Sequence, residues 1–202
     1  MGKNHSKIFV FEGVDHVGKT TIIHQLCERL QTDYDLEVFS VSFPGKETRT
    51  LGGLVYEIHH NNHKYFEKPL NNISLQLLHV ASHIDNIFSK IIPAIEEGKI
   101  ILLDRFWWST FAYGVANGIP KNLLKQIIAP ELYCLKKIKI NKYFLIKRDK
   151  KTIDFTVETY NSICKTYDEL YAQSNNSVVI FNNGEIEQTV ESILKYIVDG
   201  KG

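Results

Sequence analysis

The sequence has few cysteines, and their spacing provides neither a disulfide framework nor a zinc site. Cys27, Cys134 and Cys164 lie far apart, and no CxxC or Cys/His cluster accompanies them. An odd and scattered set is typical of reduced thiols in the cytosol. We therefore expect a cytoplasmic protein whose cysteines pack as small apolar residues.

The sequence also lacks a long hydrophobic run and an excess of one charge. No apolar stretch approaches the roughly 18 residues that a membrane span needs, and the polar first residues do not indicate a signal peptide. Lys and Arg number 24, Asp and Glu number 23, and the formal net charge is +1. We expect no membrane partner and no nucleic-acid partner, although a local basic site is compatible with this balance.

The chain does have enough apolar residues for one full-sized core. Of its 202 residues 44% are hydrophobic, so we expect a single domain over residues 1–202. Short apolar runs alternate with amphipathic helical patterns. The runs predict strands at residues 7–12, 37–42, 99–103, 142–147 and 177–182. The patterns predict helices at residues 20–31, 50–61, 74–97 with a kink at Pro93, 109–116, 121–135, 152–173 and 185–198.

This alternation favours an α/β fold with a doubly wound, five-stranded parallel sheet and helices on both faces. In such a fold ligands bind at the carboxyl ends of the strands. Three of the five predicted strand ends carry polar motifs, and these are the candidate site.

The first motif, residues 13–20, satisfies the pattern G-x-x-x-x-G-K-[ST] between a predicted strand and a predicted helix. Its glycines let successive backbone N–H groups point at phosphate oxygens, and the helix N-terminus favours anions. Lys19 supplies positive charge to the β- and γ-phosphates of ATP, and the Thr20 hydroxyl can bind Mg²⁺. We predict an ATP site made of Gly13, Val14, Asp15, His16, Val17, Gly18, Lys19, Thr20 and Thr21.

The second motif is an acid–base pair that follows the apolar run of residues 99–103. In P-loop proteins an Asp at the end of another core strand helps to hold Mg²⁺, and Asp104 fits that role. Arg105 can present a bidentate fork to a phosphate. The alternative for this pair is a surface salt bridge at a strand end.

With these anchors placed, the chain resembles the thymidylate kinase family of P-loop nucleoside monophosphate kinases in four segments. Residues 11–21 are similar to F-E-G-x-D-x-x-G-K-T-T, and residues 43–45 (Phe-Pro-Gly) resemble the family's F-P or E-P-G segment. Residues 77–83 (LLHVASH) fall where the family has L-L-F-A-A-N/D-R. Residues 104–113 resemble D-R-Y-x-x-S-x-x-A-Y. In order, at similar spacing, the segments cover most of the chain.

The resemblance implies the reaction ATP + dTMP → ADP + dTDP with Mg²⁺, performed by a homodimer. It implies that Asp15 lies near the acceptor and the metal, and that Arg105 binds the acceptor phosphate. Lys46, with Arg49 second, is the candidate for a basic residue that helps to bind this phosphate. The acceptor-binding residues that we predict are Phe43, Pro44, Lys46, His79, His83, Arg105, Trp108, Ser109 and Tyr160.

Two histidines depart from the family pattern where the acceptor base would bind. His79 stands where the family usually stacks a Phe, and His83 stands where it reads the base with an Arg. An imidazole still stacks and donates hydrogen bonds, but its charge changes near neutral pH. Either the base is not thymine or its recognition is rebuilt, or these are ordinary helix-face histidines.

The catalytic cation is a second departure. The family carries an arginine in the P-loop or in a mobile lid, but His16 occupies the P-loop position and the lid around residues 147–153 is short. Arg148 is our first candidate for this cation, with Lys150 and Lys151 behind it. The catalytic residues that we predict are Lys19, Asp15, Arg105 and Arg148. A charge run at a helix start can also be a solvated face.

Aromatic residues flank the expected acceptor pocket. Trp107 and Trp108 follow Asp104-Arg105-Phe106 directly, and we expect at least one of them to line the pocket; core or dimer packing is the alternative. Tyr160 would face the same pocket. By the resemblance, the loop at residues 182–184 lies near the adenine of ATP.

Two other functions remain open at the level of sequence. The chain could phosphorylate a different or modified nucleotide, or a deoxynucleoside, for which Glu12 would serve as the base. Alternatively, because of the missing P-loop arginine and the short lid, it could bind nucleotides with little catalysis.

Overall fold

The computed structural model describes residues 6–136, 138–149 and 155–198. Within these ranges five strands form one sheet, in the order β2-β3-β1-β4-β5, and every pairing is parallel. The strands are β1 (Lys7–Glu12), β2 (Val38–Ser42), β3 (Ile100–Asp104), β4 (Lys142–Lys147) and β5 (Ser177–Phe181). The predicted fold class is confirmed.

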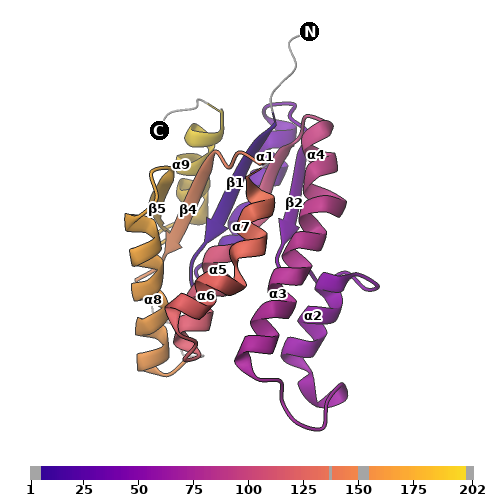
Figure 1. Cartoon of the computed structure of the whole chain (residues 1–202). Helices are drawn as coiled ribbons and strands as arrows, with labels where there is room; N and C mark the ends of the chain where they lie inside the picture. Colours follow the sequence, from indigo (N-terminus) through magenta and orange to yellow (C-terminus); the bar gives the residue numbers. More distant parts are fainter. Residues whose placement is uncertain (1–5, 137, 150–154, 199–202) are drawn as a thin grey trace.

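Helices cover both faces of the sheet (Figure 1). On one face α1 (Lys19–Thr32) packs against α9 (Ile186–Val198). A second pair of helices in contact is α5 (Trp107–Ala116) and α8 (Val157–Ala172). A further group lies beside β2 and in front of the sheet. It comprises α2 (Leu51–His60), η1 (Asn62–Lys64), α3 (Asn72–Asn86), η2 (Ile87–Ile91), α4 (Ile92–Glu96), α6 (Lys121–Ile127) and α7 (Ala129–Leu135). None of the helices in the described ranges combines the length and apolar character that crossing a bilayer requires.

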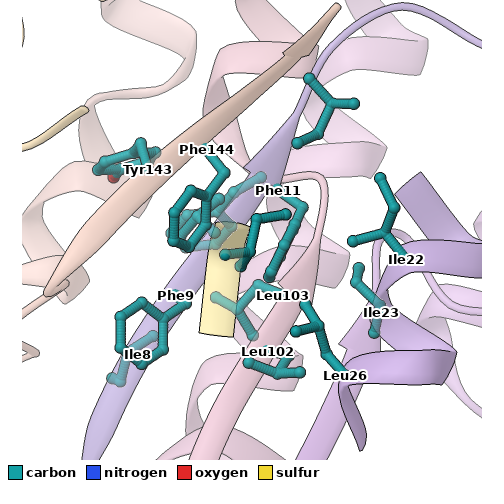
Figure 2. Close-up of a cluster of buried hydrophobic side chains, with 14 of the residues drawn as sticks. Ile8, Phe9, Phe11, Ile22, Ile23, Leu26, Leu102, Leu103, Tyr143 and Phe144 are labelled. Atoms are coloured by element: carbon teal, nitrogen blue, oxygen red, sulfur yellow. The ribbon is translucent and has the colours of Figure 1, made fainter. Parts of the chain in front are cut away.

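The core forms where the central strands are apolar on both faces. Phe11 and Phe144 are fully buried, and their ring centroids lie 5.1 Å apart. Figure 2 shows Ile22 and Leu26 of α1 beside this cluster. Burial on both faces explains why these strands read as continuous apolar runs. It also fixes the register in which Phe11 of β1 stands opposite Asp104 of β3, which brings two of the polar motifs together.

Three predicted helices differ from the observed ones. The helix predicted at residues 121–135 is two helices, because Pro130 lies in the first turn of α7 and cannot continue a preceding helix. The helix predicted at residues 74–97 is interrupted by the π-helical turn η2, just ahead of Pro93. The helix predicted from residue 152 begins at Val157, where the Thr156 side chain accepts a hydrogen bond from the N–H of Thr159. Residues 152–154 lie outside the described ranges.

Candidate functional site

The loop between β1 and α1 has the backbone curl that its glycines predict. Gly13 and Gly18 have φ angles of 138° and 94°, in the region that favours glycine. A Cβ on Gly13 would lie 2.3 Å from the carbonyl oxygen of Ile146, and one on Gly18 would lie 2.5 Å from Nδ2 of Asn182. Both positions therefore exclude a side chain on steric as well as conformational grounds.

Lys19 is folded into this loop. Its Nζ donates hydrogen bonds to the carbonyl oxygens of Gly13 (3.0 Å) and Val14 (2.7 Å), and only 5% of the residue is exposed. Burial, and secondarily the charge of Arg105, lowers the pKa of Lys19 to about 7. A bound phosphate would supply the negative charge that keeps this lysine protonated.

The two predicted metal ligands are in contact. The hydroxyl of Thr20, in the first turn of α1, donates a 2.7 Å hydrogen bond to Oδ2 of Asp104 at the end of β3. The register of β1 and β3 produces this contact, because both strands deliver their ends to the same edge of the sheet.

Arg105 joins the P-loop to the start of α5. Its Nη1 donates to the carbonyl oxygen of Gly13 and to Oγ of Ser109, both at 3.1 Å, and its Nη2 donates to Oδ1 of Asp15. Tyr113 completes the group: its hydroxyl donates a 2.6 Å bond to Oδ2 of Asp15. Burial alone would raise the pKa of Asp15, but the Arg105 cation and the Tyr113 hydrogen bond hold it below its usual value.

Glu12 lies beneath this group and is fully buried. Its Oε1 accepts a 2.9 Å bond from the N–H of Phe106, and its Oε2 accepts a 2.6 Å bond from the hydroxyl of Ser109. Burial raises the pKa of Glu12 to about 7, although the Ser109 bond and the Arg105 charge oppose the rise. With both carboxylate oxygens engaged inside the protein, the geometry does not favour Glu12 as a base for an incoming hydroxyl.

The segment at Phe43 and Pro44 borders the site next to α2 and α3. The Phe43 ring lies 4.6 Å from the ring of His83, between centroids, and Asn86 donates a 3.2 Å bond to the carbonyl oxygen of Pro44. Gly52 of α2 touches the same carbonyl so closely that a Cβ there would lie 1.8 Å away. The backbone of this segment is thus held by two helices.

The basic residues that follow this segment, Lys46 and Arg49, are exposed. Nζ of Lys46 lies 5.0 Å from the centroid of the Tyr56 ring. Arg49 is also exposed and has a left-handed backbone (φ 64°).

The two histidines of α3 differ from each other. His83 is buried, and its Nδ1 lies 2.9 Å from Oε1 of the fully buried Glu131. His79 is only partly covered, and its Nε2 lies 3.0 Å from Nδ1 of His59. Burial, and then the neighbouring imidazoles, lowers the pKa of His79 to about 3. A shift in this direction favours a neutral imidazole at His79 near neutral pH, against the expectation that its charge changes there.

The tryptophans divide between packing and hydrogen bonding. Trp108 is 2% exposed and stacks on Tyr143, with ring centroids 4.8 Å apart and planes within 4°. Trp107 donates a 3.2 Å bond from Nε1 to the hydroxyl of Tyr143. Trp108 thus belongs to the core, as the packing alternative stated, and not to the wall of an open pocket.

The remaining predicted residues lie around β4 and α8. Tyr160 is partly exposed in the first turn of α8, packed against the core, and Arg148 is exposed just after β4. Asp149, the next residue, accepts a 2.5 Å bond from Nδ2 of Asn183 and donates its N–H to the Asn183 side chain. Lys150, Lys151 and the rest of the expected lid to residue 153 lie outside the described ranges.

Sequence reasoning missed three residues that support the site. Tyr113 was only part of a family motif, and Tyr167, whose hydroxyl lies 2.8 Å from Oγ of Ser109, carried no signal at all. Asn182 donates a 2.8 Å bond to the carbonyl oxygen of Val17 and so ties the P-loop to the end of β5. The sequence singles out the loop at residues 182–184, but it does not indicate this contact of the loop's first residue with the P-loop.

Comparisons with known proteins identify the family and the fold of the chain. A family model described as thymidylate kinase matches residues 11–193. Thymidylate kinases from two strains of Staphylococcus epidermidis are each 25% identical to the chain in an alignment of 210 positions, which covers 95% of this chain and 99% of theirs. The crystal structure of thymidylate kinase from Ehrlichia chaffeensis matches with a TM-score of 0.75 and 25% identity, over 95% of this chain and 98% of that one.

Proposed function

The chain belongs to the thymidylate kinase family, and we propose that it transfers the γ-phosphate of ATP to dTMP, with ADP and dTDP as products. Family membership makes it a nucleoside monophosphate kinase that uses ATP as donor. The observation that carries the proposal for the acceptor is Arg105, a cation held against the P-loop. A monophosphate on Arg105 would lie beside the terminal phosphate of a bound nucleotide.

The guanidinium has donors left for that phosphate. Gly13, Ser109 and Asp15 use three of its five N–H groups. In the reaction an oxygen of the acceptor phosphate bonds to the γ-phosphorus while the bond to the β–γ bridging oxygen breaks and ADP leaves. That oxygen is already anionic, so the step needs no general base. It needs Lys19 and Arg105 to offset the repulsion between two anions and to position them.

Mg²⁺ is the proposed metal. The Thr20 hydroxyl and the Asp104 carboxylate are the hard oxygen donors that this ion prefers, and they are already adjacent. Among the described residues no group of three or more His, Cys, Asp or Glu side chains could hold a metal. This agrees with an ion bound mainly by phosphates and water, whose charge would neutralise the β- and γ-phosphates.

The other roles are proposals of the same kind. The P-loop residues 13–21 would bind ATP, and the exposed Arg148 would supply the transition-state cation. At the acceptor, Phe43, Pro44 and Ser109 would shape the pocket, Lys46 would assist with the phosphate, and His79 would border the base as a neutral imidazole. The buried His83 and Trp108 would act by supporting that wall. Tyr160 would contact the acceptor from α8.

We also propose that the enzyme is a cytoplasmic homodimer. Four exposed apolar side chains of α2, α3 and the following turn η2 form a set that we call the α2/α3 stripe: Leu54, Ile73, Leu77 and Phe88, exposed by 46%, 41%, 49% and 51%. An exposed apolar stripe of this kind is typical of a protein–protein interface. Three free cysteines suit a reducing compartment.

A coupled ADP-release assay across dTMP, dUMP, dCMP, UMP and the purine monophosphates tests the acceptor. We expect the highest kcat/KM with dTMP. No turnover with dTMP alongside turnover with another monophosphate would remove thymine as the base. The histidines at the base-binding positions are the specific reason to include the whole panel.

A further inference from the structure

The segment that carries Arg105 is held in an unfavourable conformation. Arg105 has a φ of 69°, in the left-handed region that residues with a Cβ rarely adopt. Its own N–H group and that of the next residue both donate hydrogen bonds to residues of β1. The N–H of Arg105 donates to the carbonyl oxygen of Phe11 (2.9 Å), and the N–H of Phe106 donates to Oε1 of Glu12 (2.9 Å).

The same carboxylate caps α5. Phe106 occupies the N-cap position of this helix and has no side chain that could accept a hydrogen bond. Oε1 of Glu12 lies within hydrogen-bond distance of the N–H groups of Phe106 and Ser109, at 2.9 and 3.4 Å. A residue of β1 therefore accepts hydrogen bonds at this helix N-terminus, and in its ionised form it adds the negative charge that the N-terminus favours.

Glu12 also sets the direction of the hydrogen bonds around Ser109. The Ser109 hydroxyl has one proton and two lone pairs. In its ionised form Glu12 can only accept, so its Oε2 takes the proton, at 2.6 Å. The two lone pairs are then left for Nη1 of Arg105 (3.1 Å) and the hydroxyl of Tyr167 (2.8 Å). In this arrangement every polar group of Ser109 is satisfied within a buried cluster.

We propose that Glu12 is a positioning residue for acceptor binding: through the Phe106 N–H and the Ser109 hydroxyl, it holds the guanidinium of Arg105 in the orientation that receives a monophosphate. This inference rests on the proposed function. It assigns Glu12 no contact with either substrate. A change at Glu12 should therefore alter the affinity for the acceptor, and only by changing the orientation of Arg105.

Glu12→Gln is the most direct test, because it keeps the size of the side chain and removes its negative charge and its acceptor-only character. In either orientation its amide would turn N–H groups toward a donor, either the Ser109 hydroxyl, whose lone pairs already receive Arg105 and Tyr167, or the backbone N–H of Phe106. We expect Kd and KM for dTMP to rise about tenfold, and Kd for ATP to change less than twofold, by isothermal titration and steady-state kinetics. Thr166→Val is the matched control, because it is an isosteric change of a buried residue on α8 whose hydroxyl donates to the Ser162 carbonyl oxygen.

A double-mutant cycle with Arg105→Lys separates positioning from general damage. If Glu12 acts through Arg105, Glu12→Gln should raise Kd for dTMP less than twofold in the Arg105→Lys background. Should Glu12→Gln fail to fold, Glu12→Asp, which keeps the charge but draws the carboxylate away from Ser109 and Phe106, should give an acceptor-selective loss of several-fold in the same cycle.

Equal losses for ATP and dTMP, multiplicative losses in the cycle, or an unchanged Kd for dTMP would each overturn the role of Glu12. These results differ from failure of the proposed function, in which the wild-type enzyme itself would not phosphorylate dTMP.

Discussion

The hydroxyl of Thr20 donates a 2.7 Å hydrogen bond to the carboxylate of Asp104, across the boundary between the P-loop and the third strand. These residues are 84 positions apart in sequence, and only the parallel pairing of β1 and β3 brings them together. Their contact gives the proposed magnesium site two adjacent oxygen donors on rigid elements.

Asp104→Asn tests this site, because the amide oxygen can still accept from Thr20 but the negative charge is gone. We expect the Mg²⁺ concentration for half-maximal ADP release to rise at least tenfold, with the melting temperature nearly unchanged. Asp33→Asn, which neutralises an exposed acid at the end of α1, is the control. An unchanged Mg²⁺ requirement in Asp104→Asn would exclude this carboxylate as a ligand.

Arg105→Lys tests the acceptor phosphate site. A single ammonium cannot replace a planar fork that contacts Gly13, Ser109 and Asp15 at once. Loss of a charge-assisted hydrogen bond of about 1.5–3 kcal/mol corresponds to roughly a 10- to 100-fold loss of acceptor affinity. We expect KM for dTMP to rise by that factor and KM for ATP to change less than threefold. A larger effect on ATP than on dTMP would place Arg105 at the donor instead.

The buried lysine makes ATP binding depend on pH. Burial lowers the pKa of Lys19 to about 7 in the free enzyme, so its charge is lost as the pH rises above 7. Bound phosphate favours the charged form, and binding at pH 8 should therefore take up a proton. Isothermal titration in two buffers of different ionisation enthalpy measures this uptake. If ATP binding at pH 8 takes up no proton, in the wild type and in Glu12→Gln alike, the lowered pKa of Lys19 is contradicted.

Glu12 should make the stability of the unliganded protein depend on pH. Burial raises its pKa from 4.5 to about 7, so between these values the folded state holds a proton that the unfolded state has lost. The Glu12 contribution to stability is therefore largest at low pH and falls as the pH rises from about 4.5 to 7. Urea unfolding across this range should show a smaller decline in Glu12→Gln than in the wild type. Parallel curves would mean that Glu12 titrates normally.

Leu77→Glu tests the dimer. A charge in the middle of the α2/α3 stripe should convert a dimer of two 23.3 kDa chains into a monomer in sedimentation equilibrium, without loss of helical signal. Tyr133→Glu, at an exposed aromatic of α7 outside the stripe, should leave the dimer intact. A wild-type monomer at micromolar concentration would refute the proposal.

The sequence was sufficient for the parts of the site that local chemistry determines. The glycines and lysine of the P-loop specify a phosphate cradle wherever a strand meets a helix, and Asp104 follows from the apolar strand before it. Contacts between side chains that are far apart in the sequence could not be predicted from it. Glu12 meets Ser109 and His83 meets Glu131 only because helices α5, α3 and α7 pack as they do, and no local pattern encodes that packing. The same limit applies to Trp108, whose burial against Tyr143 depends on the α5–β4 contact.

The most direct test of the central claim is to offer equimolar thymidine and dTMP with ATP and Mg²⁺, and to follow the products by ³¹P NMR. An acceptor phosphate on Arg105 predicts that dTDP and ADP form in equal amounts while thymidine stays unmodified. Phosphorylation of thymidine without formation of dTDP would contradict it, because the group on Arg105 would then not be the acceptor's phosphate.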